Sequence, residues 1–591
     1  MRASLSFVTA ALVLLSSSGV VQAGLQNPSA EALQALADLS RSPPDKHLPD
    51  GYVPQAATYN AGVSKSNGGV AWSVDPQPQM PNTNNTAKFE IKPASAQSAQ
   101  PATAAAAGQR TTASGTKDGG MRLSAQAGSV NASTFYPTNP PNFPLAVRGP
   151  YLSAWLPSGS DRSATPPNIQ GNGGYLAGQY PAFWTTSYGA DGEFRLGWSG
   201  FIRINGKSYQ WMGDSFGTLV QQGPNAVQLS AEYTATRTIF AFQADSVKFN
   251  VTFMTPITPN DYLRQSLPLS YLHFELDTTT TKKKDIQIYT EIDERWVTGH
   301  DYDFQNYPYN MQFQVVNSTS MYLVQRNNPE VYTEFRQRAE WGSSVYAVKN
   351  VAGLSSRNNN NVVTQLEFLT KGNLTFDHGG VGGPDNSFAY AVNFSAPNAP
   401  SDVVFAVGHL RNPYVNYVRA VPGVPGKSYQ EDRYGYWQAQ FPNFNDAVAF
   451  FLNDFDDALV HAKALDSQIV ADAKKAAGGG IVGDHYAAIA QLAVRQALGA
   501  IEITISRDGT GAYNASDALI FLKEISSNGD MSTVDVIFPL FPLLAYLNVE
   551  LLRDLLEPLY VYAETLYPNK VRFIASCSRT PVLTFFCIAL P

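Results

Sequence analysis

The chain has 591 residues, of which 44% are hydrophobic and 12% aromatic, so it is long enough for two or more domains with their own cores. A net charge of -7 excludes the basic surface of a nucleic-acid-binding protein, and we expect no nucleic-acid partner. Both cysteines, Cys577 and Cys587, lie near the C-terminus, so apolar cores rather than disulfides are expected to hold the fold.

The first residues have the features of a secretory signal peptide. Arg2 precedes an apolar stretch, and Val21-Gln22-Ala23 fits a small-x-small cleavage site. The apolar stretch is shorter than a membrane-spanning helix requires, and no other sufficiently long apolar stretch follows. We therefore predict a signal peptide over residues 1–23 and a secreted, extracellular protein that leaves the membrane after cleavage.

N-glycosylation triplets of the form N-x-[ST] support export. Each triplet alone is weak evidence because the pattern arises by chance, but a set of them behind a signal peptide indicates a glycoprotein. The predicted sites are Asn84, Asn131, Asn250, Asn317, Asn373, Asn393 and Asn514.

Residues 24–143 are predicted to be a low-complexity, disordered region. One short helix is expected at SAEALQALADLS, with Ser29 as its N-cap. The remainder is rich in Ala, Ser, Gln, Pro, Thr and Gly, and it has too few large apolar residues to build a core.

Residues 144–440 alternate between apolar and polar side chains, which predicts β-strands. In DSVKFNVTFM the alternation places Val247, Phe249, Val251 and Phe253 on one face, and SYLHFEL and DIQIYTEI alternate similarly. His273 falls within such a pattern and is interpreted as a structural or surface residue. Repeated half-buried strands joined by short turns predict a large antiparallel β-sandwich.

One tight turn in this region is specified by its sequence. FIRINGKSYQWMG reads as two strands joined at Asn205-Gly206, a pair that favours a two-residue hairpin turn.

Residues 441–567 change to a helical period. The apolar residues of the first helical stretch share one face, followed by a GGG break and a second helix through YAAIAQLAVRQALGAIEI with Asp484 as its cap. A third helix is expected at NVELLRDLLEPLYVYAETLYP, with Asn548 as cap and Pro558 inside. Such one-sided helices are typical of packed helical hairpins.

Several motifs are set aside. NGKSY and PGKSY lack the first glycine of a phosphate-binding loop, and GWSG lacks the spacing and helix of a nucleophile elbow. The histidines are scattered without metal-ligand spacing, so we expect no metal site.

Six segments together resemble the fungal secreted glutaminase A family: FPLAVRGPYLSAWLP, LRQSLPLSYL, EDRYGYWQAQF, AFFLNDFDDALVHAKALDSQI, AVRQALGAIEITI and KEISSNGDMSTVDVIFPLFP. The resemblance runs from about residue 144 to 568. It implies a β-sandwich domain followed by a six-hairpin, (α/α)6-type helical domain. It also implies hydrolysis of the small-molecule substrate L-glutamine to L-glutamate and ammonia, without a metal or organic cofactor; it does not indicate an oligomeric state.

The tail over residues 568–591 matches no part of this resemblance. A family member would continue after LYPNK through further helices, whereas this chain reads VRFIASCSRTPVLTFFCIALP. We expect a frameshift, a retained intron or a wrong gene model from about Val571, with a natural divergent tail as the alternative. The helical domain is therefore expected to be incomplete, which places the activity of this chain in doubt.

Amide hydrolysis needs an activated water or nucleophile, a proton donor for ammonia and a group that stabilises the oxyanion. The stretch KEISSNGDMSTVDVIFPLFP offers these groups. Glu524 or Asp535 is a candidate general base or a candidate ligand of the substrate ammonium group. Lys523 is a candidate to bind the substrate carboxylate or the oxyanion. Ser526 or Ser527 is expected to bind substrate or, as the less favoured alternative, to attack it.

A structural interpretation of the same stretch stays open. Ser527-Asn528-Gly529-Asp530 makes a good turn between helices, Lys523 then lies at a solvated end, and Asp535 is a helix cap. Family likeness nevertheless favours a loop that faces an active site.

Two further groups of residues allow both interpretations. Arg433 and Trp437 in EDRYGYWQ are interpreted mainly as a structural seam between the domains, with substrate binding as the alternative. Arg495 and Gln496 are expected to form interhelical hydrogen bonds, and Glu502 is a possible cleft carboxylate.

Two other functions remain open at this stage. A sandwich joined to a helical toroid also suits a carbohydrate-active hydrolase, which needs two carboxylates across a sugar bond and would act on glycans rather than glutamine. The second alternative is a non-catalytic secreted protein that keeps only the sandwich. In that case limited proteolysis should leave a stable core of residues 144–440.

Overall fold

The computed structural model describes residues 121–124, 140, 142–157, 175–184, 195–213, 224–297, 308–335, 337–379, 386–421, 424, 427–525 and 529–566. Several predictions lie outside the described residues: the signal peptide, the helix at Ser29 and the tail after residue 566. The same holds for Asn84, Asn131, Ser526, Ser527, Cys577 and Cys587.

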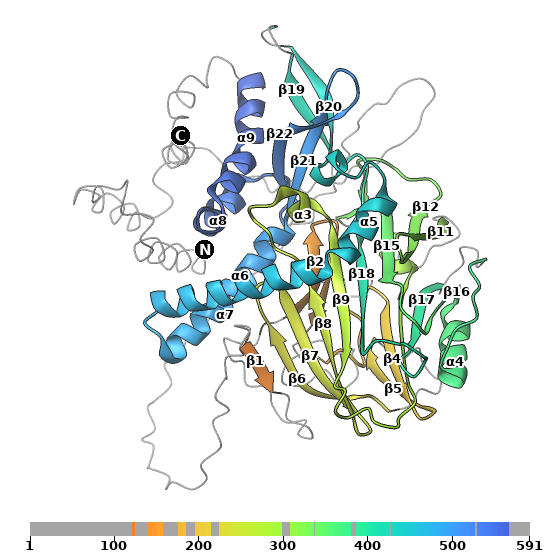
Figure 1. The fold of residues 1–591 in the computed structure, drawn as a ribbon. Helices are drawn as coiled ribbons and strands as arrows, with labels where there is room; N and C mark the ends of the chain where they lie inside the picture. Colours follow the sequence, from red (N-terminus) through yellow and green to blue (C-terminus); the bar gives the residue numbers. More distant parts are fainter. Residues whose placement is uncertain are drawn as a thin grey trace, which may run out of the picture. The chain divides into compact units, whose positions relative to one another are not determined.

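Two antiparallel sheets form a β-sandwich, here called the sandwich (Figure 1). The larger sheet has nine strands, in the order β1 (Met121–Ser124), β6 (Val227–Tyr233), β7 (Arg237–Ala244), β8 (Val247–Met254), β9 (Leu269–Leu276), β18 (Asp402–Leu410), β15 (Ser343–Lys349), β12 (Thr319–Arg326) and β11 (Tyr309–Val316). The smaller has five strands, in the order β16 (Leu354–Asn360), β17 (Asn386–Asn393), β10 (Ile286–Asp293), β4 (Trp198–Ile204) and β5 (Lys207–Met212). The predicted sandwich is thus confirmed.

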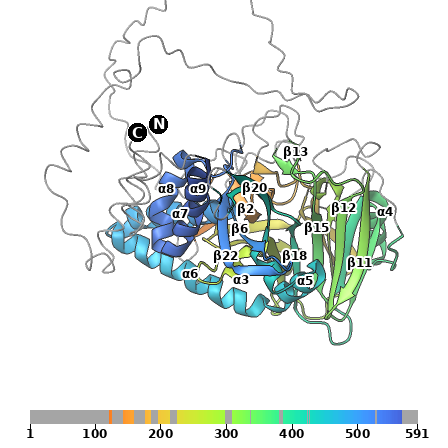
Figure 2. The same ribbon diagram turned by 90° about the horizontal axis from the view of Figure 1, so that it is seen from above.

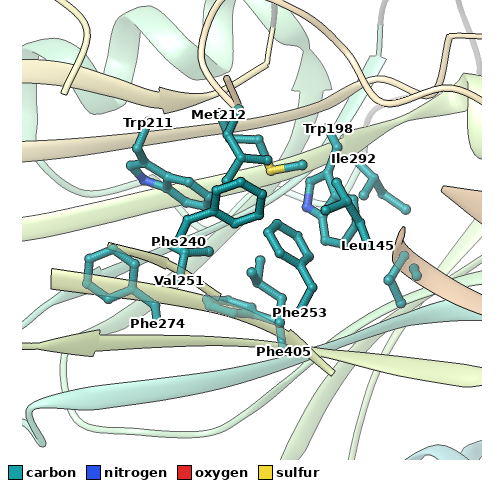
Figure 3. Close-up of a cluster of buried hydrophobic side chains, with 14 of the residues drawn as sticks. Leu145, Trp198, Trp211, Met212, Phe240, Val251, Phe253, Phe274, Ile292 and Phe405 are labelled. Carbon is teal, nitrogen blue, oxygen red and sulfur yellow. The ribbon is translucent and has the colours of Figure 1, made fainter. Parts of the chain in front are cut away.

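Aromatic side chains fill the space between the two sheets (Figure 3). Trp198 and Ile292 come from the smaller sheet, and Phe253 and Phe405 from the larger. The Trp198 ring meets Phe253 edge-on at 5.2 Å between ring centroids, a favoured aromatic geometry. Apolar residues at every second strand position therefore meet across the sandwich.

Two sequence predictions within the sandwich are confirmed. In β8, Val247, Phe249, Val251 and Phe253 are all buried, whereas the residues between them are exposed or half-buried. The β4–β5 turn has φ of 49° at Asn205 and 85° at Gly206. Positive φ at both turn residues is the backbone that two-residue hairpins favour.

The alternation predicted for DIQIYTEI differs from the structure, because every residue of β10 is buried. One face of β10 meets the larger sheet, and the other lies under α4 (Asn361–Lys371), whose Phe368 packs against Tyr289 and Phe201. Figure 1 places α4 beside β16 and β17, and Figure 2 shows it at the right-hand edge of the view, on the side away from β6.

Four residues of the stretch predicted as disordered form a strand. β1 pairs in antiparallel register with β6, from Met121 opposite Tyr233 to Ser124 opposite Ser230. The average composition of a long polar stretch does not reveal a four-residue strand, because four residues barely change that average.

The C-terminal segment, residues 444–566, contains most of the helices. These are α5 (Phe444–Asn453), α6 (Phe455–Ala476), α7 (Gly480–Gly499), α8 (Val534–Leu547) and α9 (Val549–Leu566). The predicted glycine break is confirmed by positive φ at Gly478, Gly479 and Gly480. Asn548 accepts a hydrogen bond from the Glu550 N–H at 2.9 Å, as expected of a cap.

The helical segment packs directly on the sandwich. Phe451 of α5 stacks on Tyr271 of β9, with 3.9 Å between ring centroids. Asp466 of α6 accepts hydrogen bonds from the Thr236 hydroxyl at 2.8 Å and from Arg237 at 3.0 Å, both at the turn between β6 and β7. None of the described helices is long and apolar enough to span a membrane.

The second predicted helix is too long. It ends at Gly499, and IEITISR forms β21 (Ile501–Arg507), which pairs with β22 (Tyr513–Leu522). These strands join β19 (Val415–Ala420) and β20 (Ser428–Gly435) in a four-stranded sheet. The prediction was wrong because a short run with Ile at alternate positions is apolar enough to read as more helix.

Two further local predictions were wrong. Asp484 lies inside α7 and binds Lys474 at 2.7 Å instead of capping the helix, which starts at Gly480. The bounds of helix α8 were not predicted, although Asp535 was offered as a helix cap, because Pro539 and Pro542 lie inside it and prolines normally break a helix interior.

Candidate functional site

The stretch KEISSNGD leaves the end of β22 and leads into α8. The Lys523 N–H donates to the Ala500 carbonyl at 2.9 Å, and the Glu524 N–H donates to the Asp530 carbonyl at 2.9 Å. The Ser532 N–H closes the loop by donating to the Leu522 carbonyl at 2.6 Å. The loop is therefore pinned at both ends, and it connects a strand to a helix instead of joining two helices as predicted.

Lys523 is 1% exposed, so the predicted solvated end was wrong. Its ammonium binds the Glu334 carboxylate at 2.7 Å and the Gly529 carbonyl at 2.9 Å. The same ammonium lies 4.8 Å from the centre of the Tyr151 ring. A buried lysine needs such partners, and these ones fix the loop to β13 (Glu334–Phe335) and to the turn between β2 (Asn142–Gly149) and β3 (Leu152–Pro157).

Arg411 lies on another side of Tyr151, inside a group of aromatic rings. Its guanidinium is 3.9 Å from the ring centre of Tyr151, 4.7 Å from that of Tyr414 and 5.1 Å from that of Trp341. It forms an ion pair with Glu502 of β21. Glu502, a predicted cleft carboxylate, is therefore buried and already paired.

The charges of this cluster depend on one another. Burial lowers the pKa of Arg411, but the Glu502 carboxylate and Tyr151 outweigh burial and leave that pKa above its ordinary value. Burial raises the pKa of Tyr151 well above its ordinary value. Tyr151 therefore stays a neutral phenol beside two cations at neutral pH.

A small hollow of about 10 Å³, enough for about one water molecule, lies next to Tyr151. It is lined by Tyr151 and Leu152, by Trp296 and Val297 at the 3-10 turn η5 (Glu294–Trp296), by Arg338 and Ala339 of β14 (Arg338–Ala339), and by His409. Burial and the nearby Arg411 lower the pKa of His409 to about 3, so its ring is neutral at physiological pH.

The two predicted carboxylates differ in exposure. Glu524 is 8% exposed, whereas Asp535 is exposed in the first turn of α8. The N-cap of α8 is Thr533, so Asp535 is not the cap, although its charge is favoured near a helix N-terminus. Asp530 is exposed as well. Asp535 is thus the predicted base that solvent and a solute reach.

The contacts of Arg433 and Trp437 favour the structural interpretation of EDRYGYWQ. Arg433 is fully buried and binds Glu431 at 3.0 Å and Asp517 at 2.8 Å. Trp437, also fully buried in the 3-10 turn η6 (Tyr436–Ala439), donates from Nε1 to the Tyr414 hydroxyl at 3.0 Å. Both therefore hold the four-stranded sheet and the cluster around Arg411 in place.

Arg495 does not form the interhelical hydrogen bonds that were predicted. Its guanidinium donates to the carbonyls of Ala235 at 2.9 Å and Thr234 at 3.5 Å, which belong to the turn between β6 and β7. The neighbouring Gln496 is exposed. Helical period alone does not show which neighbour a buried arginine meets.

Five of the predicted glycosylation sites lie among the described residues. Asn250, Asn317 and Asn373 are exposed. Asn393 and Asn514 are half-buried, and their side-chain oxygens accept hydrogen bonds from the N–H groups of Ser395 and Ser516. The part of the chain that the structure describes holds no group of three His, Cys, Asp or Glu placed to bind a metal.

Sequence reasoning missed Tyr151, Glu334, Trp341, His409 and Arg411. Tyr151, the most distant of them in sequence, lies 372 positions before Lys523, and the five residues come from four separate strand ends or turns. A weak signal existed, because RGPYLSAW and HLRNPYV both combine cations with aromatic residues. Only the folded chain brings them to one place.

Two families of known proteins match separate parts of the chain. Residues 236–472 match a family described as "Domain of unknown function (DUF5127)", and residues 483–575 match one described as "Glutaminase A six helical-hairpin domain". The second match covers β21, β22, the loop from Lys523 and the helices α8 and α9.

Two curated fungal proteins are similar over most of the chain. Glutaminase A of Aspergillus oryzae is 34% identical over 444 residues, which cover 74% of this chain and 58% of that protein. A probable glutaminase of Arthroderma benhamiae is 28% identical over 458 residues, which cover 73% of this chain and 48% of that protein. The chain thus spans about half the length of these relatives.

Proposed function

This chain belongs to the glutaminase A family, and we propose that it hydrolyses the side-chain amide of L-glutamine to L-glutamate and ammonia. The observation that carries the proposal is the 34% identity to glutaminase A of Aspergillus oryzae, over 444 residues. The aligned length is too great for a shared motif alone, and the family match at 483–575 includes the loop from Lys523.

The chemistry proposed for this site assigns roles to two of the described residues, Asp535 and Lys523. Asp535 acts as the general base: its exposed carboxylate takes a proton from water as the water oxygen bonds to the amide carbon. Protonated Asp535 then gives this proton to the amide nitrogen, the C–N bond of the tetrahedral intermediate breaks, and ammonia leaves. One water is consumed, and one glutamate and one ammonia are formed.

Lys523 has a positioning role in this proposal. Its ammonium is already bound to Glu334 and Gly529, so it holds the loop before α8 in place and leaves the substrate to other groups. Support for this role comes from its 1% exposure, which is too low for a group that meets substrate directly.

The test is ammonia release from L-glutamine, with Asp535→Asn as the variant. Loss of a general base reduces kcat by about 10²–10⁴-fold and should leave the unfolding midpoint nearly unchanged, since Asp535 is exposed. Asp457→Asn is the matched control, because Asp457 is also an exposed acid in the first turn of a helix, α6.

Equal rates for Asp535→Asn and Asp457→Asn would remove Asp535 from the mechanism. Absence of ammonia release by the folded, unmodified chain would contradict the proposed reaction itself.

We also propose that the chain is a secreted glycoprotein. The signal-peptide pattern over residues 1–23 and the exposure of Asn250, Asn317 and Asn373 support this. Expression in a fungal host should give protein in the medium whose N-terminus follows Ala23 and whose mass falls on enzymatic deglycosylation. Retention in the cells with an intact N-terminus would contradict it.

A further inference from the structure

We propose that Tyr151 is a positioning residue for the proposed reaction: its aromatic ring holds the loop that leads from Lys523 to Asp535 against the sandwich. The inference rests on the proposed function. It gives a role to the hairpin of β2 and β3, which precedes the residues that either family matches.

The hairpin is fixed where the sandwich and the C-terminal segment meet. The Arg148 guanidinium of β2 donates to the Leu267 carbonyl, just before β9, at 3.1 Å. It also donates to the Leu498 carbonyl of α7 at 3.2 Å. Tyr151 follows in the turn and is 7% exposed. Its ring therefore lies on a support that both parts of the chain hold.

The ring contacts both arms of the loop before α8. At the start of the loop, the Lys523 ammonium lies 4.8 Å from the ring centre. Lys523 pairs with Met531 in an isolated antiparallel bridge, and the Met531 sulfur lies 3.9 Å from the Tyr151 hydroxyl oxygen. Met531 is four residues before Asp535. A shift of this ring is therefore transmitted to the first turn of α8, where Asp535 lies.

A second cation, from the sandwich, meets the same ring. The Arg411 guanidinium lies 3.9 Å from the ring centre, and Arg411 and Lys523 are each 1% exposed. An aromatic ring attracts a cation within about 6 Å of its centre, and more strongly when water is excluded. Glu502 pairs with Arg411 and Glu334 with Lys523, so the two cations do not simply repel each other. Tyr151 thus joins a cation of the sandwich to a cation of the loop.

Tyr151 acts through the loop and not on the substrate itself. Burial holds the pKa of its hydroxyl well above the ordinary value, so the phenol keeps its proton at neutral pH. In the proposed reaction the exposed Asp535 meets the substrate. A misplacement of a catalytic group by about 1 Å can lower a rate by about 10²-fold. Loss of the ring should therefore slow the reaction through the position of Asp535.

The test measures kcat, KM and amide hydrogen exchange in Tyr151→Leu, which removes the ring and keeps an apolar side chain. We expect kcat to fall by about 10–10²-fold and KM to change by less than about threefold. Exchange at the amides of Glu524 and Ser532, which close the loop, should accelerate at least about fivefold, as the loss of one cation–π contact predicts. Exchange in β8 should change less.

Three further variants separate positioning from general stability. Tyr151→Phe keeps the ring over both cations and should recover most of the lost kcat. Tyr151→Met, whose flexible side chain fills much of the same volume, is the second variant should Tyr151→Leu fail to fold, and it should lower kcat similarly. Phe201→Leu is the matched control: it removes a similarly buried ring, which packs on Tyr289 under α4. It should lower the unfolding midpoint and leave kcat unchanged.

The double variant Tyr151→Leu/Lys523→Met asks whether the ring acts through Lys523. Residues that act through one contact have non-additive effects. The double variant should therefore lower kcat by no more than about twofold beyond the slower single variant. Fully multiplied losses of kcat would contradict the proposed link.

Other outcomes would also overturn the inference. One is a folded Tyr151→Leu or Tyr151→Met chain whose kcat stays within about twofold of the unmodified chain, well short of the loss expected from misplacement. Another is a loss of kcat that Tyr151→Phe shares in full, or equal acceleration of exchange in the loop and in β8.

The reaction and the positioning role fail separately. Absence of ammonia release by the unmodified chain would refute the reaction, while the exchange measurement would still decide whether Tyr151 holds the loop. Ammonia release with an unchanged kcat in Tyr151→Leu would leave the reaction standing and refute the role of Tyr151.

Discussion

The sandwich and the C-terminal segment use their apolar residues differently. In the sandwich, Trp198, Phe253 and Phe405 are at most 1% exposed. In α8 only Ile537 and Leu544 are buried among the described residues of that helix, while Val534 is 41% exposed and Phe538 45% exposed. Helix α8 therefore contributes only two buried side chains, and the core of the C-terminal segment is completed by α9 with Leu551, Leu552 and Leu555.

This difference shows how the two regions depend on each other. In the sandwich, the apolar faces of the strands are covered by the opposite sheet, by α4 or by α5. The C-terminal segment is joined to it by the apolar cluster that α5 shares with β9 and by polar links, including Asp466 to Arg237 and Tyr262 to Asp554 at 2.7 Å. Several such polar links meet around Tyr151, at the candidate site.

The largest expected effect is a core substitution in the sandwich. Trp198→Ala removes a ring that contacts Phe253 and Trp296, and should lower the free energy of unfolding by about 3–5 kcal/mol. Phe538→Ala in α8 should change it by only about 0.5 kcal/mol, as for most exposed sites. Urea denaturation measures both, and equal losses would break the comparison.

Breaking the ion pair between Arg411 and Glu502 should lower the free energy of unfolding by about 3 kcal/mol. Arg411→Met leaves the buried Glu502 carboxylate without its partner, and such a charge is strongly destabilising. The double variant Arg411→Met/Glu502→Gln should recover much of the loss, because it removes both charges. A double variant no more stable than Arg411→Met, by urea denaturation, would contradict this reasoning.

The pH dependence of stability should report on Glu291, which is buried in β10 beside Tyr289 and Gln365. Burial raises the pKa of Glu291 from 4.5 to about 7. The folded carboxyl thus holds a proton that the unfolded chain releases above pH 4.5, so stability falls as pH rises to about 7, by about 3 kcal/mol at most.

Glu291→Gln keeps the shape and removes the titration. The variant should flatten this part of the pH profile, measured as thermal midpoint between pH 4.5 and 8. An unchanged slope would show that other groups cause it.

A smaller effect is expected at the loop before α8. Lys523→Met keeps most of the buried volume but removes the link to Glu334, which is 30% exposed, so the loss should be about 1–2 kcal/mol. Hydrogen exchange at the amides of Glu524 and Ser532 should accelerate more than exchange in β8. Equal acceleration in both places would show that the link is not local.

Sequence patterns predicted the elements whose cause is local. The alternation in β8 and the Asn205-Gly206 turn need no distant partner to be recognised. The predictions failed where tertiary contacts decide: β21 is a strand because β20 and β22 pair with it, and α8 forms despite two prolines. At the site, Lys523 was singled out from sequence, but its burial and its partner Glu334 follow only from the fold.

The decisive experiment measures ammonia release from L-glutamine by the purified, unmodified chain. The sample should first show one cooperative unfolding transition, so that a negative result refers to folded protein. We expect saturable release of ammonia together with an equal amount of L-glutamate. Folded protein that releases neither product at any substrate concentration would contradict it.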